Sequence, residues 1–143
     1  MPAYVRERMG APNNPLKLRA AELGITLVER EWVPSSRRAH ECTELARAQG
    51  KLEPFHAAVL RAYWSEGKDL HEWSVLEACA EVAGVEGMRA AVEAGAYKTA
   101  VDERVVAAHE LGIHAVPTFL FADKFLVQGA QTLETFERVM ERL

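Results

Sequence analysis

Apolar residues recur with the spacing of an α-helix through the middle of the chain, from about residue 35 to residue 111. The clearest stripe follows Pro54 and has apolar residues at i, i+3, i+4, i+7 and i+8, namely Phe55, Ala58, Val59, Ala62 and Tyr63. Glycines close these stretches, which is typical of helix ends because glycine takes the left-handed conformation there without steric cost. The pattern predicts successive helices that end near Gly50, Gly67, Gly84, Gly95 and Gly112.

The pattern changes after Gly112. Two short apolar runs, Thr118–Ala122 and Phe125–Gln128, predict an antiparallel hairpin. Asp123-Lys124 is its predicted turn, although lysine is a poor residue for a turn position with positive φ. Thr132 is expected to cap a last helix, whose predicted inward residues are Leu133, Phe136, Val139 and Met140.

The sequence also contains several signals for helix starts. Pro15 can open a short helix through Glu22. A serine after Pro34 is expected to cap the first long helix, and Ser74-Val75-Leu76-Glu77 has the form of a capping box. Between the first two helices, Ile25–Val33 is β-branched and aromatic, which predicts either an extended segment or an edge strand.

The composition is that of one ordinary soluble domain: 143 residues, 49% apolar and 27% charged. A net charge of −4 gives no reason to expect nucleic-acid binding. Arg37-Arg38 lies beside Glu41 and Glu44, so we interpret it as a solvated helix face, with a phosphate clamp as the alternative. The sequence has no apolar run of transmembrane length and no secretion signal, so we expect no membrane span and a cytoplasmic location.

The two cysteines are predicted to be packing residues. Cys42 and Cys79 lie on apolar helix faces, and neither stands at a helix N-terminus, where the dipole would lower the thiol pKa. A disulfide between them is not expected in a reducing compartment. The aromatic residues Trp32, Tyr63, Trp64 and Trp73 are expected to cap the helical core, with a hydrophobic substrate wall as the alternative. No histidine pair has the spacing of a metal site, so no metal is predicted.

Several blocks of sequence together carry a family resemblance. They are Pro34–Glu41, Ala46–Lys51, Phe55–Trp64, Val116–Phe119 and Gly129–Gln131. In this order, over roughly residues 13–143, they resemble DsbA-like proteins of the FrnE type. The resemblance implies an α/β, mostly helical protein with a partial thioredoxin-like fold. Residues 1–143 would form a single domain, with a helical insertion region at 35–111 and the C-terminal β-β-α half at 112–143.

The catalytic group of that family is missing from the sequence. It is a Cys-x-x-Cys at the start of the first helix, or a serine in the related kappa-class glutathione transferases and 2-hydroxychromene-2-carboxylate isomerases. By that alignment the chain lacks the N-terminal β-α-β unit that carries either group. We therefore expect no catalytic residue in this sequence, and we leave open whether the protein is an enzyme.

The same resemblance implies a binding site at the Val116-Pro117 loop. Pro117 resembles the cis-proline of the family, which would turn the backbone of Val116 outward to pair with a ligand backbone. Ala115 and His114 would line the same groove. The predicted function is binding of a peptide, thiol or partner by a thiol-disulfide oxidoreductase relative without redox turnover of its own. The alternative is a glutathione-dependent isomerase or transferase whose site a dimer completes; apart from glutathione, no cofactor is expected.

The strand that begins at Thr118 raises the question of a partner. In the implied fold this strand is interior, whereas here Thr118–Phe121 would be an apolar edge without lysine or internal proline to prevent pairing. We therefore expect a homodimer in which these strands, or Ile25–Val33, complete the sheet.

Overall fold

The structure is a computed structural model that describes residues 14–28 and 32–143. The chain divides into two units, Met1–Val101 and Asp102–Leu143, and each is described by itself. The division falls inside helix α7, Lys98–Glu110, which is earlier in the chain than the junction expected at residues 111 and 112. The expectation of a single domain stays a prediction.

The first unit is helical, as predicted. Its helices are α2 (Pro15–Glu22), α3 (Arg37–Ala48), α4 (Leu52–Leu60), α5 (Trp73–Ala83), α6 (Met88–Glu93) and the beginning of α7. A π-helical turn, η1 (Arg61–Ser65), continues α4 and was not predicted. The glycines expected to end helices do have positive φ, as at Gly84 directly after α5.

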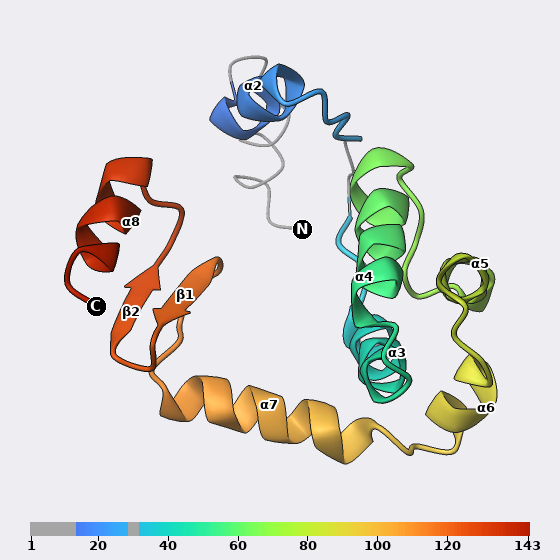
Figure 1. Ribbon diagram of the computed structural model, residues 1–143. Helices are drawn as coiled ribbons and strands as arrows, with labels where there is room; N and C mark the ends of the chain where they lie inside the picture. The colour runs from blue at the N-terminus through green and yellow to red at the C-terminus, as the bar shows by residue number, and fades with distance from the viewer. Residues whose placement is uncertain (1–13, 29–31) are drawn as a thin grey trace. The chain divides into compact units, whose positions relative to one another are not determined.

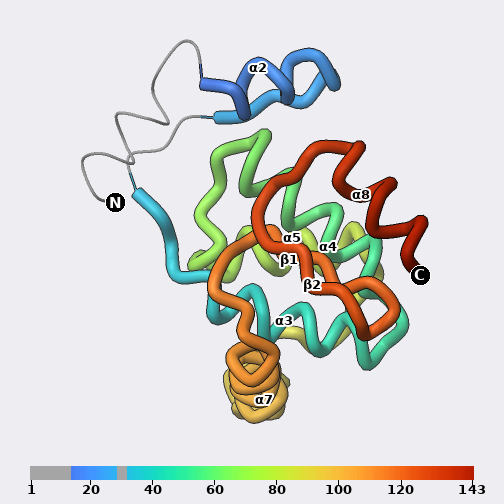
Figure 2. The backbone as a smooth tube through the Cα atoms, turned by 90° about the vertical axis from the view of Figure 1, so that its left-hand side faces the viewer, coloured from blue at the N-terminus to red at the C-terminus, as the bar shows by residue number. Residues whose placement is uncertain are grey.

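The core of this unit lies among α3, α4, α5 and α6. Helix α3 packs against α4 and α6, and α4 packs against α5 (Figure 1). Helices α3, α4 and α5 are also labelled in Figure 2. Cys42, Phe55 and Leu76 are the largest fully buried side chains, one from each of α3, α4 and α5. Tyr63 and Trp73 pack against this core as predicted.

The other two aromatic residues expected to cap the core lie outside it. Trp32 and Trp64 are 43% and 37% exposed, and neither belongs to the core cluster or the partly buried residues around it. Trp64 stands in the π-helical turn and lines an apolar cavity with Leu16, Ile25, Leu27 and Leu60.

Two of the predicted caps differ from the structure. Ser36 occupies the N-cap of α3, but its side chain makes no capping hydrogen bond. The predicted capping box is wrong, because α5 begins at Trp73, and Ser74 lies inside the helix. The carbonyl of Glu72 accepts the first hydrogen bonds of α5, from the backbone N–H groups of Val75 and Leu76 at 3.2 and 3.3 Å. Conversely, Asn14 caps α2 by accepting from the N–H of Leu16 at 2.9 Å, a cap that was not predicted.

The segment between α2 and α3 forms no strand at residues 25–28 or 32–33, and residues 29–31 of the predicted stretch lie outside the described residues. The described part of the segment thus contains no edge strand. It is joined to the helical core by a backbone hydrogen bond from Val28 N to Trp64 O at 2.8 Å.

The second unit contains most of α7, the strands β1 (Thr118–Phe121) and β2 (Phe125–Gln128), and helix α8 (Leu133–Met140). The strands pair antiparallel, from Thr118 opposite Gln128 to Phe121 opposite Phe125. The predicted hairpin is therefore confirmed, but its first strand is one residue shorter than expected. Ala122 and Asp123, not Asp123 and Lys124, are the turn residues with positive φ (47° and 55°), and Lys124 N donates to Phe121 O at 2.9 Å.

Helix α8 packs on one face of the hairpin (Figure 1). The ring of Phe136 meets Phe119 edge-on at 4.9 Å and lies 5.9 Å from Phe121, centroid to centroid. Thr132 caps α8 as predicted, since its hydroxyl accepts from Thr135 N at 3.3 Å. The prediction that Leu133 and Met140 point inward is wrong, because these side chains are 72% and 57% exposed. The hairpin is too small to cover the whole apolar stripe of α8, and no residue from 102 to 143 is fully buried.

Candidate functional site

The loop between α7 and β1 is closed at its base by hydrogen bonds. Helix α7 ends at Glu110, and two residues later a positive φ of 69° at Gly112 lets the N–H groups of Gly112 and Ile113 turn back to His109 O and Ala108 O at 2.9 and 3.0 Å. At the other end, Pro117 O accepts from Gly129 N at 2.7 Å. The Val116–Pro117 peptide bond is cis.

The side-chain amide of Gln128 holds this loop from the last residue of β2. Its Nε2 donates to Gly112 O at 3.0 Å, and its Oε1 accepts from His114 N at 3.2 Å. Both functions of the amide are thus used on backbone groups two residues apart. We call this arrangement the Gln128 clamp. Thr118 adds a further tie, since its hydroxyl donates to Ala115 O at 2.5 Å.

The four predicted site residues lie next to each other at the exposed tip of this loop. His114, Ala115, Val116 and Pro117 are all exposed, and Val116 is 90% exposed. Within residues 14–28 and 32–143, the backbone N–H and C=O of Val116 have no hydrogen-bond partner. A held loop that presents one unused donor and one unused acceptor can take an additional extended chain by backbone hydrogen bonds.

The two cysteines belong to the first unit, whereas the loop belongs to the second. Both are free and buried, on α3 and α5 in the helical unit. Burial raises the pKa of Cys42 to about 12, and the neighbouring carboxylate of Glu41 acts in the same direction. Burial likewise raises the pKa of Cys79. The thiolate is the nucleophile in thiol-disulfide exchange, so neither residue is prepared for that reaction.

The described residues offer no metal centre: among them, no three His, Cys, Asp or Glu side chains lie close enough to hold an ion. Nor does this part of the chain contain a helix long and apolar enough to cross a membrane.

Gln128 is the site residue that sequence reasoning missed. Its place at the end of a predicted strand gave no sign that its side chain would turn back to the loop. The one available signal was the register of the hairpin, which places Gln128 opposite Thr118, directly after the loop. A long polar side chain at that position reaches the backbone that enters the strand.

Comparison with known proteins shows the family to which the chain belongs. A model of the DSBA-like thioredoxin domain matches residues 4–141. The crystal structure of a probable DsbA oxidoreductase from Streptomyces coelicolor is similar, with 26% sequence identity and a TM-score of 0.74. The match covers 90% of this chain but 57% of that chain, so the present chain spans little more than half of the solved protein. No curated protein matches the chain. The predicted partial thioredoxin-like α/β class is confirmed, and the chain belongs to the family of DsbA-like thioredoxin domains.

Proposed function

We propose that this chain is a relative of the thiol-disulfide oxidoreductases that binds an extended peptide, a thiol or a partner protein at the Val116-Pro117 loop. We also propose that the chain's own two cysteines carry out no redox turnover. The observation that carries it is the loop itself, in which the backbone N–H and C=O of the 90% exposed Val116 have no partner among the described residues.

The support for binding is energetic as well as geometric. A loop already fixed at both ends loses little conformational freedom when a ligand pairs with it. Here Gly112, Ala115 and Pro117 each accept a hydrogen bond through their carbonyls, from Gln128, Thr118 and Gly129. The loop is therefore ordered before any ligand arrives, and Val116 stands out from it.

The support against redox turnover comes from the two thiols. Cys42 and Cys79 are buried, and their pKa values are raised. Redox chemistry at this loop would need a nucleophile other than these two residues. Free thiols also agree with a reducing compartment, and we propose the cytoplasm as the location. Within the family we propose the FrnE-type branch, on the resemblance of the segments that form α3 and α4.

A peptide titration followed by amide resonances tests the proposal. The probe is a six-residue peptide of β-branched residues around an S-alkylated cysteine, which cannot form a disulfide. We expect saturable shifts of the Ala115 and Val116 amides, and binding about tenfold weaker in Gln128→Ala, whose loop must be ordered on binding.

The matched control for that variant is Gln49→Ala. Gln49 makes the same kind of double amide contact, to Glu86 O at 2.9 Å and from Glu86 N at 3.0 Å, but in the helical unit. It should leave peptide binding unchanged. Absence of saturable shifts at the loop, or equal losses in the two variants, would overturn the proposal. If reduced glutathione binds saturably at the loop and the peptide does not, the isomerase or transferase alternative is favoured instead.

We further propose a homodimer that forms through β1. In residues 102–143 this strand is hydrogen-bonded on one side, to β2, and Leu120 at its middle is 44% exposed. Pairing of two β1 strands would use the open edge and cover Leu120. Light scattering at micromolar concentration should give twice the chain mass. Leu120→Lys should give a monomer, whereas Val82→Lys, at a 76% exposed valine of α5, should not. A folded monomeric wild type would contradict the homodimer without affecting the peptide test.

A further inference from the structure

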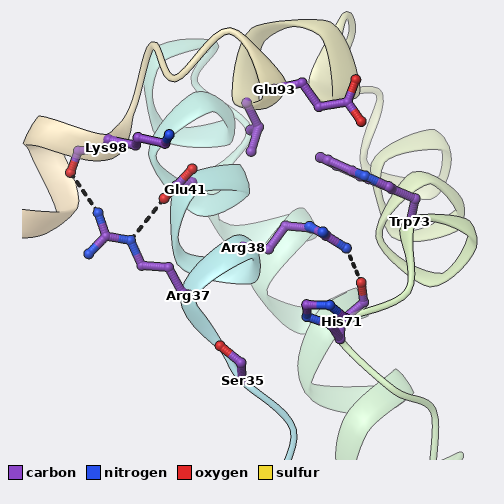
Figure 3. A pocket seen from close by; sticks show the side chains of 9 residues that line it. Ser35, Arg37, Arg38, Glu41, His71, Trp73, Glu93 and Lys98 are labelled. Atoms are coloured by element: carbon purple, nitrogen blue, oxygen red, sulfur yellow. Dashed lines mark hydrogen bonds and ion pairs between the residues drawn. The ribbon is translucent and has the colours of Figure 1, made fainter.

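A cavity of about 370 Å³ lies in the helical unit, within residues that the loop proposal does not use. The N-terminal turn of α3, the segment before α5, α6 and the start of α7 surround it (Figure 3). Three cationic side chains line it, Arg37, Arg38 and Lys98, together with two carboxylates, Glu41 and Glu93. The cavity lining thus carries more positive than negative side chains, although the whole chain has a net charge of −4. The partners of each charged group show which of these charges are neutralised.

Arg37 is already neutralised. Its Nε donates to Glu41 Oε1 at 2.8 Å, and its Nη2 donates to the backbone carbonyl of Lys98 at 3.0 Å (Figure 3). The carboxylate of Glu41 is 7% exposed, so this pair is shielded from solvent. Arg37 and Glu41 therefore form part of the wall and hold α3 to the start of α7. They are not the groups that would meet a ligand.

Arg38 is held in place without a carboxylate. One Nη donates to the backbone carbonyl of His71, and the guanidinium lies 4.6 Å from the ring centroid of Trp73. Trp73 is itself fixed by a second cation, since Arg89 lies 5.2 Å from its centroid and makes a salt bridge of 2.9 Å to Glu77. A carbonyl and an aromatic ring orient the guanidinium but leave its charge uncompensated.

Lys98 is the second uncompensated cation. Its ammonium group makes no hydrogen bond or ion pair in the described part of the chain. Arg38 and Lys98 line the same cavity from α3 and α7, and both arginines stand in the first turn of α3, where the helix dipole adds positive potential. An oriented guanidinium together with an unpaired ammonium is a pairing suited to a carboxylate or a phosphate.

Glu93 decides between these two anions. It lines the cavity from α6 and has no hydrogen-bond or ion-pair partner among the described residues. Its charge repels the second negative charge of a phosphate, but it can accept a hydrogen bond from a ligand. We infer that this cavity is a binding site for a small carboxylate that carries a hydrogen-bond donor, such as a hydroxy or amino group, with Arg38 and Lys98 on the carboxylate and Glu93 on the donor.

The test is a titration of the full chain in low-chloride buffer with lactate, propionate and inorganic phosphate, followed by amide resonances. Lactate and propionate have the same carbon skeleton, and propionate lacks the donor. We expect saturable shifts of residues around the cavity with lactate, weaker binding of propionate, and the weakest binding for phosphate. No saturable shift at the cavity with lactate, or tighter binding of phosphate, would overturn the inference.

Two variants locate the binding groups. Lys98→Met removes a charge that contacts no partner, so the fold should be kept, and lactate should bind roughly tenfold more weakly. Glu93→Gln should reverse the order of preference and favour phosphate. The matched control is Lys124→Met, at the exposed end of the hairpin turn, which should bind lactate like the wild type. Equal affinity in Lys98→Met and wild type would also overturn the inference.

Discussion

The side-chain amide of Gln128 donates to the backbone carbonyl of Gly112 at 3.0 Å. The contact joins the last residue of β2 to the glycine that follows α7, sixteen positions earlier in the chain. It fixes the base of the loop whose tip is Val116, and the second half of the same amide accepts from His114 N. The loop is therefore held at its base by hydrogen bonds, while Val116 at its tip is 90% exposed.

The Gln128 clamp predicts slow amide exchange at His114, because the N–H of this exposed residue donates to Gln128 Oε1. In Gln128→Ala the N–H loses that acceptor and the carbonyl of Gly112 loses its donor. We expect exchange at His114 to rise at least tenfold and the free energy of unfolding of the second unit to fall by about 1–2 kcal/mol. Hydrogen exchange and denaturant unfolding measure the two effects. Unchanged exchange at His114 would contradict the clamp.

The difference between what could and could not be predicted from the sequence is visible at this loop. Local signals placed the helix end at Gly112 and the strand at Thr118, because backbone conformation at those points depends on the residues themselves. The partner of His114 N could not be found in this way, since it depends on the hairpin register and the reach of one side chain. The uncompensated charge of Arg38 could not be predicted from local sequence either. Its neighbours His71 and Trp73 lie more than thirty positions away in the chain.

The start of α5 was also not predicted correctly from the sequence. Ser74-Val75-Leu76-Glu77 has the form of a capping box with Ser74 as the N-cap, yet the N-cap is Glu72 and the helix begins at Trp73, two residues earlier than predicted. The sequence pattern does not show that the Trp73 ring contacts both Arg38 and Arg89, because these are tertiary contacts. The same reasoning explains Leu133. Its helical spacing predicted an inward position, but the two-stranded hairpin does not extend far enough to cover it.

The attachment of α8 to the hairpin depends on Phe136. Its ring contacts Phe119 and Phe121, at centroid distances of 4.9 and 5.9 Å. Phe136→Ala should lower the free energy of unfolding by about 2–3 kcal/mol, less than a fully buried phenylalanine because the ring is half-buried. Leu133→Ala, on the same helix but 72% exposed, should change it by less than about 0.5 kcal/mol. Equal effects of the two substitutions in chemical denaturation would refute this packing.

The hairpin turn is strained at Ala122, which has a φ of 47°. An L-residue with a Cβ loses roughly 1 kcal/mol in this left-handed conformation, whereas asparagine tolerates it. Ala122→Asn should therefore raise the free energy of unfolding by about 0.5–1 kcal/mol. Lys124 lies in the same turn but has no positive φ, so Lys124→Asn should give no such gain. A melting temperature that falls in Ala122→Asn would contradict the turn geometry.

Cys42 and Cys79 should be unreactive in the folded protein. Both are free and buried, with raised thiol pKa values. A thiol-specific chromogenic reagent at neutral pH should react slowly under native conditions and at once in denaturant, in both cases with two thiols per chain. The chain should reduce insulin no faster than buffer with the same reductant. Rapid native labelling of either cysteine would show that the thiol is accessible and would reopen the case for redox turnover.

The buried thiol of Cys42 also predicts how stability depends on pH. Burial raises the pKa of Cys42 from 9.0 to about 12, so between these values the unfolded chain loses a proton that the folded chain keeps. The unfolded state therefore binds fewer protons, and the free energy of unfolding falls as pH rises through this range. One such thiol contributes a slope of up to about 1.4 kcal/mol per pH unit. Denaturant unfolding at several pH values above 9 should give a smaller slope in Cys42→Ala than in the wild type. The lysines and tyrosines that titrate in the same range are common to both proteins, so the difference isolates the thiol. Identical slopes would mean that Cys42 ionises as readily in the folded chain as in the unfolded one.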